Sequence, residues 1–226
     1  MATELDGPRI EPRAGGAARQ LVVFLHGYGA DGNDLIDIGR AWQPAMPHAA
    51  FVSPHAPNPC GQAPMGREWF PLTVRDPAER WTGANKVAPV LNAFLDAELA
   101  RRNLPPSALA LVGFSQGTMM ALHVGLRRAT APFAIVGFSG LLVVPPDADA
   151  DAMAAEITAR PPVLLIHGDS DDRIPAQALF HAANGLAALG VPVEWHLSPG
   201  IGHGIDQEGL RQGAEFLVRR MPQTGR

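Results

Sequence analysis

The sequence predicts an α/β protein with a mostly parallel central sheet and helices on both faces. Short apolar runs typical of buried strands alternate along the chain with amphipathic, helix-like stretches. The 226 residues are 46% hydrophobic and 18% charged, which is ordinary for a globular domain. We therefore expect one domain over residues 19–226, after a loose lead-in at residues 1–18 that is rich in Gly, Pro and Arg.

The individual elements follow from the length and spacing of the apolar runs. Short apolar runs predict strands at residues 20–25, 49–52, 108–112, 133–138, 163–167 and 193–197. Apolar residues at helical spacing predict helices at residues 86–102, 116–128, 176–189 and 206–220. Asp206 is well placed to cap the last of these helices.

Two segments lack a regular pattern. Residues 54–85 form a long stretch rich in Pro and Gly, with three large aromatic residues, Trp69, Phe70 and Trp81. Long loops inside domains are usually functional or disordered, and the aromatic residues argue against disorder. We expect these three side chains either to bind substrate or to anchor the loop. Residues 141–160 have room for a loop and one short helix but no separate cap domain, which predicts an open active site.

The pattern Gly-x-Ser-x-Gly at residues 113–117 lies between a predicted strand and a predicted helix. A serine at such a turn adopts a strained backbone conformation and points its hydroxyl out of the sheet. The flanking glycines are needed because a Cβ would collide with the strand or the helix. This context predicts that Ser115 is a catalytic nucleophile. Ser139, in a similar-looking segment, lacks a following helix pattern and is expected to be a strand-end serine near the site.

A nucleophilic serine needs a general base, and the base needs an orienting carboxylate. In α/β-hydrolases the chain order is serine, acid, histidine. Here an acidic loop with Asp169, Asp171 and Asp172 follows the strand at 163–167, and His203 stands in a glycine-rich loop before the last helix. The order and spacing predict His203 as the base and one of the three aspartates as the acid.

An early glycine-rich loop follows the first predicted strand and supplies the remaining part of the site. An oxyanion hole needs two backbone N–H groups, one from the residue after the nucleophile, here Gln116, and one from an early loop, here assigned to Tyr28. The same loop matches the dinucleotide-binding pattern Gly27-x-Gly29-x-x-Gly32. That alternative is disfavoured because the second predicted strand ends without the carboxylate that would hold a ribose.

Composition excludes several other classes. The net charge of −4 argues against nucleic acid as the main partner, and the single cysteine, Cys60, allows no intrachain disulfide. No apolar run is long enough to span a membrane, and the N-terminus lacks a signal-peptide pattern, so we expect a cytoplasmic protein without stable membrane insertion. His55 and Cys60 do not make a metal site by spacing. We expect no metal and no cofactor.

These motifs resemble the phospholipase/carboxylesterase family of small α/β-hydrolases, which includes acyl-protein thioesterases and bacterial carboxylesterases. The resemblance covers nearly the whole chain, through residues 25–32, 113–117, 167–171 and 202–204. It implies an α/β-hydrolase fold, nucleophile Ser115, acid Asp171, base His203, and oxyanion amides of Tyr28 and Gln116. This chain departs from the family pattern at two positions. Tyr28 stands where the family often has leucine, and we expect the tyrosine to narrow or polarise the acyl pocket. Thr118 stands where the family often has a second glycine.

The sequence thus predicts a cofactor-free serine carboxylesterase that hydrolyses short- to medium-chain esters of small molecules through an acyl-enzyme. An acyl-protein thioesterase or a lysophospholipase is the alternative within the same chemistry. A non-catalytic, partner-binding hydrolase fold is the remote alternative from another class. The physiological ester and the oligomeric state stay open, with a homodimer among the states considered.

Overall fold

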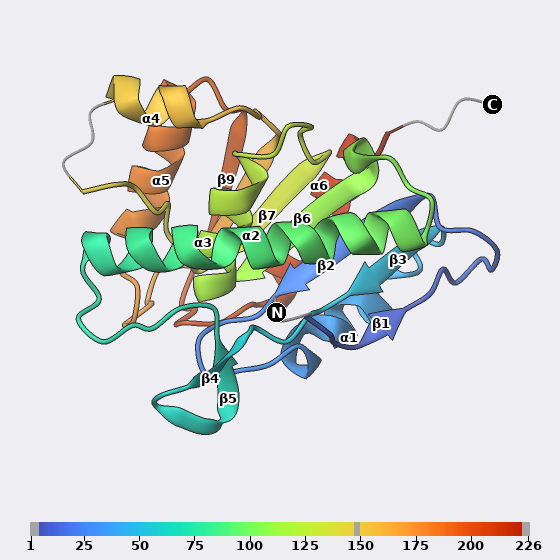
Figure 1. Cartoon of the computed structure of the whole chain (residues 1–226), viewed down its shortest axis with the longest axis horizontal. Helices are drawn as coiled ribbons and strands as arrows, with labels where there is room; N and C mark the ends of the chain where they lie inside the picture. The colour runs from blue at the N-terminus through green and yellow to red at the C-terminus, as the bar shows by residue number, and fades with distance from the viewer. Residues whose placement is uncertain (1–4, 147–149, 223–226) are drawn as a thin grey trace.

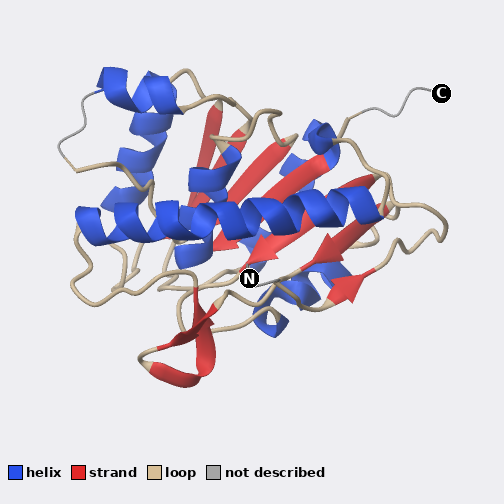
Figure 2. Ribbon diagram, in the orientation of Figure 1, coloured by secondary structure: helices blue, strands red, loops and turns tan. Residues whose placement is uncertain are grey.

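A computed structural model describes residues 5–146 and 150–222, which are built around one seven-stranded sheet (Figures 1 and 2). The strand order is β1-β3-β2-β6-β7-β8-β9, and only β1 runs antiparallel to its neighbour. The strands are β1 Arg9–Ile10, β2 Gln20–Leu25, β3 Ala49–Val52, β6 Leu109–Phe114, β7 Ala134–Phe138, β8 Val163–Gly168 and β9 Val193–Ser198. The fold is an α/β-hydrolase fold, as predicted, and all six predicted strands are present.

Helices cover both faces of the sheet, as Figure 1 shows, because successive strand residues point to opposite sides. The helices are α1 Asn33–Trp42, α2 Pro77–Arg101, α3 Gln116–Gly125, α4 Ala150–Glu156, α5 Gln177–Ala188 and α6 Gln207–Arg220, with a 3-10 turn at Pro106–Ala108. In β2, Leu21, Val23 and Leu25 pack into the core beneath α2, α3 and α5, whereas Val22 and Phe24 pack into the core beneath α1 and α6. In the described part of the chain, no helix is long and apolar enough to cross a membrane.

Helix α2 begins well before the predicted start at residue 86. Its first turn is fixed by polar capping rather than by an apolar face: the Asp76 carboxylate accepts a hydrogen bond from the Glu79 amide at 2.7 Å, and Pro77 occupies the first helical position. The prediction from apolar spacing missed this turn for that reason. Asp206 caps α6 in the same way, as predicted, by accepting from the Gly209 amide.

Residues 54–85 are less irregular than predicted. They contain a two-stranded antiparallel hairpin, β4 Asn58–Cys60 and β5 Ala63–Glu68, which projects from the body (Figure 1) and is hydrogen-bonded to the loop between β2 and α1. The hairpin was missed because these strands carry Asn, Pro, Gly, Arg and Glu instead of β-branched or aromatic residues. Between residues 141 and 160, the described part holds the single short helix α4.

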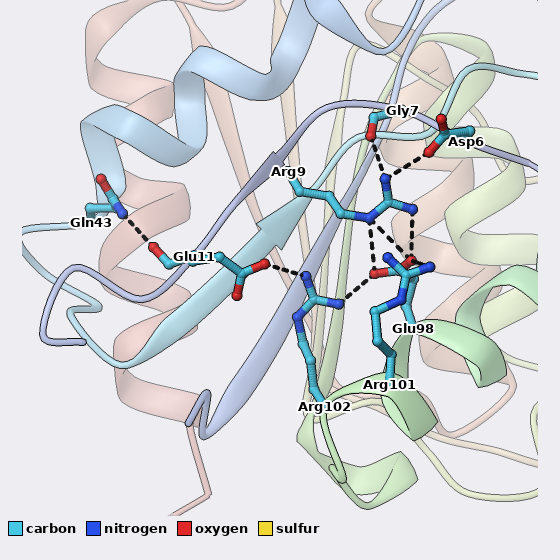
Figure 3. Close-up of polar contacts among 8 residues, drawn as sticks. All are labelled: Asp6, Gly7, Arg9, Glu11, Gln43, Glu98, Arg101 and Arg102. Carbon is cyan, nitrogen blue, oxygen red and sulfur yellow. Dashed lines mark hydrogen bonds and ion pairs between the residues drawn. The ribbon is translucent and has the colours of Figure 1, made fainter. Parts of the chain in front are cut away.

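The expectation of a loose lead-in is wrong for residues 5–11, which pack against the rest of the fold. Strand β1 pairs with β3, and Leu5 and Ile10 are buried in the two cores. An ion-pair network also ties this segment to α2 (Figure 3). The buried Glu98 carboxylate forms ion pairs with Arg9 at 2.8 Å, Arg101 at 3.0 Å and Arg102 at 2.5 Å. Glu11 forms a further ion pair with Arg102 at 3.0 Å.

Glu98→Gln should destabilise the fold by about 3 kcal/mol, because it removes the buried anionic partner of the Arg102 and Arg9 guanidinium groups. Each arginine would keep only an exposed carboxylate, Glu11 for Arg102 and Asp6 for Arg9. The matched control is Glu11→Gln, which removes a mostly exposed partner of the same Arg102 and should cost less than about 1 kcal/mol. Urea unfolding measures both variants. Equal losses for the two would show that the buried carboxylate does not hold the N-terminal segment.

Candidate active site

Ser115 sits at the sharp turn between β6 and α3 with φ 54° and ψ −114°, a conformation that costs energy for any non-glycine residue. The flanking glycines make the turn possible. A Cβ at Gly113 would lie 2.4 Å from the Gly117 backbone, and one at Gly117 would lie 1.7 Å from the Leu25 carbonyl oxygen. These contacts are the steric reason for the pattern, as the sequence predicted.

Thr118 fits beneath this turn because two other glycines leave space for it. A Cβ at Gly137 would meet the Thr118 methyl group at 2.6 Å, and a Cβ at Gly140 would meet the Thr118 Cβ at 2.3 Å. The Thr118 hydroxyl lies 2.8 Å from the carbonyl oxygens of both Gly113 and Phe138. Thr118 therefore braces the turn that holds the serine.

Ser115, His203 and Asp171 come together at the carboxyl end of the sheet. The Ser115 Oγ lies 3.0 Å from His203 Nε2, and His203 Nδ1 lies 2.7 Å from Asp171 Oδ2. The Phe114 ring lies against the imidazole, with 5.0 Å between centroids. A hydroxyl, an imidazole and a carboxylate within hydrogen-bonding distance in this order are the groups that a serine needs to pass its proton to a histidine.

The Asp171 carboxylate is buried and held by its own loop. Its second oxygen, Oδ1, accepts hydrogen bonds from the amides of Arg173 and Ile174, both at 2.9 Å. Burial acts to raise the pKa of Asp171, but the Ile174 amide, His203 and the Arg173 amide outweigh it and hold the pKa below its ordinary value. Of the other two acidic residues, Asp169 accepts from the Gly200 amide at 2.7 Å and so braces the histidine loop, and Asp172 is exposed.

His167 is a polar neighbour of this site to which the sequence analysis assigned no role. Its Nε2 lies 2.8 Å from the Ile174 carbonyl oxygen and 3.2 Å from Asp171 Oδ2, and the ring is buried. A nitrogen facing a carbonyl and a carboxylate must carry the proton. Because the residue ends a buried strand run, its position behind the acid could have been inferred from the same strand that placed Asp171.

The glycine-rich loop at residues 26–32, the candidate oxyanion loop, follows β2 and lies against the serine. A Cβ at Gly27 would lie 3.4 Å from the Ser115 Cβ. No backbone hydrogen bond among the described residues uses the Tyr28 amide, and the Gln116 amide opens α3, where the first N–H groups have no intrahelical partner. Two free amides beside the hydroxyl match the need of an oxyanion hole.

His26 orders this loop rather than serving as a base. Its Nε2 accepts the Ala56 amide at 3.0 Å, and its Nδ1 lies 2.8 Å from the Gly27 carbonyl oxygen. Burial lowers the pKa of His26 to about 4, so the ring is neutral near pH 7. A neutral ring that donates through Nδ1 and accepts through Nε2 satisfies both partners.

The hairpin β4–β5 supports the loop from outside. The Gly29 amide donates to Arg67 O at 2.9 Å, and the Arg67 amide donates to Ala30 O at 2.7 Å. The phenol of Tyr28 faces the same hairpin: burial, and then the side chains of Cys60 and Glu68, raise the Tyr28 pKa above its ordinary value. The tyrosine thus anchors the loop whose amide it contributes.

Trp69 and Phe70 lie in the core and pack around the oxyanion loop and the serine turn. Trp69 donates from its indole nitrogen to His26 O at 3.0 Å, and its amide donates to the Gln116 side chain at 2.9 Å. The Gln116 amide group in turn donates to Phe70 O at 2.7 Å. Trp81 is half-buried between His123 and Arg127.

A cavity of about 310 Å³ opens beside Ser115 and His203. Its apolar walls come from Leu72, Phe114, Met119, Leu141 and Ile174, and three arginines also line it: Arg75, Arg80 and Arg173. None of the three aromatic residues expected to bind substrate is among its described lining residues. Trp69, Phe70 and Trp81 were expected either to bind substrate or to anchor their loop, and their contacts match the anchoring role. The lining residues were missed because they come from four separate segments.

Ser115 lies at a strained turn between a strand and a helix, at the carboxyl end of a mostly parallel sheet. A candidate nucleophile in this position is the defining feature of an α/β-hydrolase. Among the described residues, no three His, Cys, Asp or Glu side chains gather as a metal site. The chain belongs to the phospholipase/carboxylesterase family, whose model matches residues 6–220.

Known relatives agree with this assignment over nearly the whole chain. Acyl-protein thioesterase 1 of Gibberella zeae is 27% identical and covers 95% of this chain and 97% of its own. Esterase YpfH of Escherichia coli is 25% identical, covering 91% and 84%. The crystal structure of esterase PE8 has a TM-score of 0.90 at 45% identity, covering 96% of this chain and 99% of that one. These relatives support an esterase function.

Proposed function

We propose that this protein is a serine carboxylesterase that hydrolyses short- to medium-chain esters through an acyl-enzyme on Ser115. The observation that carries the proposal is the hydrogen-bonded order Ser115, His203, Asp171, in which Ser115 and His203 line an accessible cavity and Asp171 is buried behind them. Membership of an esterase family and the likeness to esterase PE8 support it.

Each residue has a distinct role in this mechanism. His203 accepts the proton of Ser115 as its Oγ attacks the ester carbonyl, and Asp171 stabilises the imidazolium that forms. The amides of Tyr28 and Gln116 donate hydrogen bonds to the oxyanion of the tetrahedral intermediate. His203 then protonates the leaving alcohol. A water molecule, deprotonated by His203, attacks the acyl-serine and releases the acid.

The size of the cavity supports the proposed chain-length range. Its apolar walls shelter the first carbons of an acyl chain, and each buried CH₂ contributes about 0.8 kcal/mol. With 4-nitrophenyl esters from C2 to C16, kcat/KM should rise over the first several carbons and then level off. Absence of hydrolysis across the series would contradict an esterase function altogether.

The acyl-protein thioesterase alternative has one observation in its favour. A second, mainly apolar cavity of about 280 Å³ shares Arg80 and Leu141 with the first and continues along Leu142, Val143 and α5. A longer chain that reached this cavity would keep gaining contact. A rate that rises steadily to C16, together with cleavage of an S-palmitoylated peptide, would favour the thioesterase.

A further inference from the structure

Three arginines from two separate segments line the cavity beside Ser115 and His203. Arg75 and Arg80 flank the start of α2, and Arg173 follows the catalytic-acid candidate in the loop after β8. Close to 100 residues of sequence separate Arg173 from the other two, and only the fold brings them to one cavity. None of them was singled out by the sequence motifs.

Within the described residues, the guanidinium groups of these three arginines make no ion pair and no hydrogen bond. Several arginines elsewhere in the fold do have carboxylate partners, among them Arg9, Arg40, Arg102, Arg127 and Arg211. Burial lowers the pKa of the Arg80 guanidinium below its ordinary value. The negative charges of Asp76 and Glu79 raise this pKa in part, and the positive charge of Arg75 lowers it again. Arg75 and Arg80 thus present two positive charges to the same cavity, Arg80 from a half-buried position and Arg75 from an exposed one.

The carboxylates on the same segments are used elsewhere. Asp76 accepts from the Glu79 amide. Glu79 accepts from the amides of Thr73, Val74 and Arg75, and these bonds hold Arg75 at its positive φ of 64°. Asp171 faces His203 and two loop amides, and the exposed Asp172 does not line the cavity.

We propose that Arg75, Arg80 and Arg173 select esters that carry an oxyanion group, a carboxylate or a phosphate, a few atoms from the scissile carbonyl. This inference rests on the proposed esterase function and names its substrate class. A guanidinium is always charged and binds a carboxylate or phosphate through two parallel hydrogen bonds. Three such groups around one cavity attract an anionic substrate and stabilise its bound form, and among the described residues no carboxylate of the protein is paired with any of them.

Two matched substrate pairs test the proposal and distinguish the two oxyanions. The first compares mono-4-nitrophenyl adipate, with a free carboxylate on the acyl side, with its neutral methyl ester. The second compares 3-acetoxyphenyl phosphate, with the charge on the alcohol side, with neutral 3-methoxyphenyl acetate. In at least one pair, kcat/KM should favour the anion by about tenfold, the effect of one charge-assisted hydrogen bond, and chiefly through KM. Raising NaCl from about 20 mM to about 0.5 M should shrink this ratio.

The triple variant Arg75→Gln, Arg80→Gln, Arg173→Gln should bring the anion-to-neutral ratio to about one. The ratio is the readout, and turnover of the neutral ester reports that the variant is folded. Arg13→Gln removes one positive charge by the same substitution from an exposed residue outside the cavity and should leave the ratio unchanged. A wild-type ratio of one or less in both pairs, with the neutral esters hydrolysed, overturns the selection and leaves the esterase function standing. No turnover of any of the four esters overturns both.

Discussion

Ser115→Ala and His203→Ala should each lower kcat/KM for a 4-nitrophenyl ester by at least about 10⁴-fold, and the double variant should be scarcely worse. The serine hydroxyl and the imidazole nitrogen are 3.0 Å apart and act in one proton transfer, so removing either one abolishes the same step. The reductions in kcat/KM caused by the two single substitutions therefore do not add in the double variant.

The matched control for this pair is Ser139→Ala. Ser139 also has a positive φ and ends a neighbouring strand, but its hydroxyl donates to the Gly204 carbonyl oxygen at 3.3 Å instead of facing His203 Nε2. Activity within a few-fold of wild type is expected for it. Purified Ser115→Ala protein that kept more than a few per cent of activity would contradict the assignment of the nucleophile.

Asp171→Asn should lower kcat by about 10⁴-fold, because the amide no longer holds His203 with its proton on Nδ1 and no longer stabilises the imidazolium. Asp172→Asn is the matched control, since it changes the adjacent, exposed carboxylate and should have little effect. Steady-state kinetics of the two purified variants measures the difference. A crippling loss in Asp172→Asn with an active Asp171→Asn would move the acid by one residue.

The parts of the structure that the sequence predicted are those fixed by local sterics. The glycines around Ser115 have one physical reason, the contact of a Cβ with backbone atoms, and that reason can be read from a pattern of five residues. The strands were equally readable because buried parallel strands are continuous apolar runs. The first turn of α2 was also readable in principle, since Asp76, Pro77 and Glu79 form a capping pattern, but it carries no apolar stripe.

The parts that the sequence did not predict depend on contacts between distant segments. Whether Trp69 contacts substrate or packs behind the site is decided by His26 and Gln116, which are 43 and 47 residues away. The same holds for the arginines, because nothing local in residues 75, 80 or 173 indicates a shared cavity. Strand β1 is two residues long and owes its position to pairing with β3 and to the ion pairs of Arg9.

The central claim is that Ser115 is the nucleophile of an esterase, and covalent labelling tests it most directly. The protein is treated with a 4-nitrophenyl alkylphosphonate, which reacts with an activated serine and releases one nitrophenolate per label. We predict one adduct per chain by mass spectrometry of the intact protein, located on the peptide that contains Ser115 and absent from Ser115→Ala. An unlabelled chain, or an adduct that persists in Ser115→Ala, would contradict the claim.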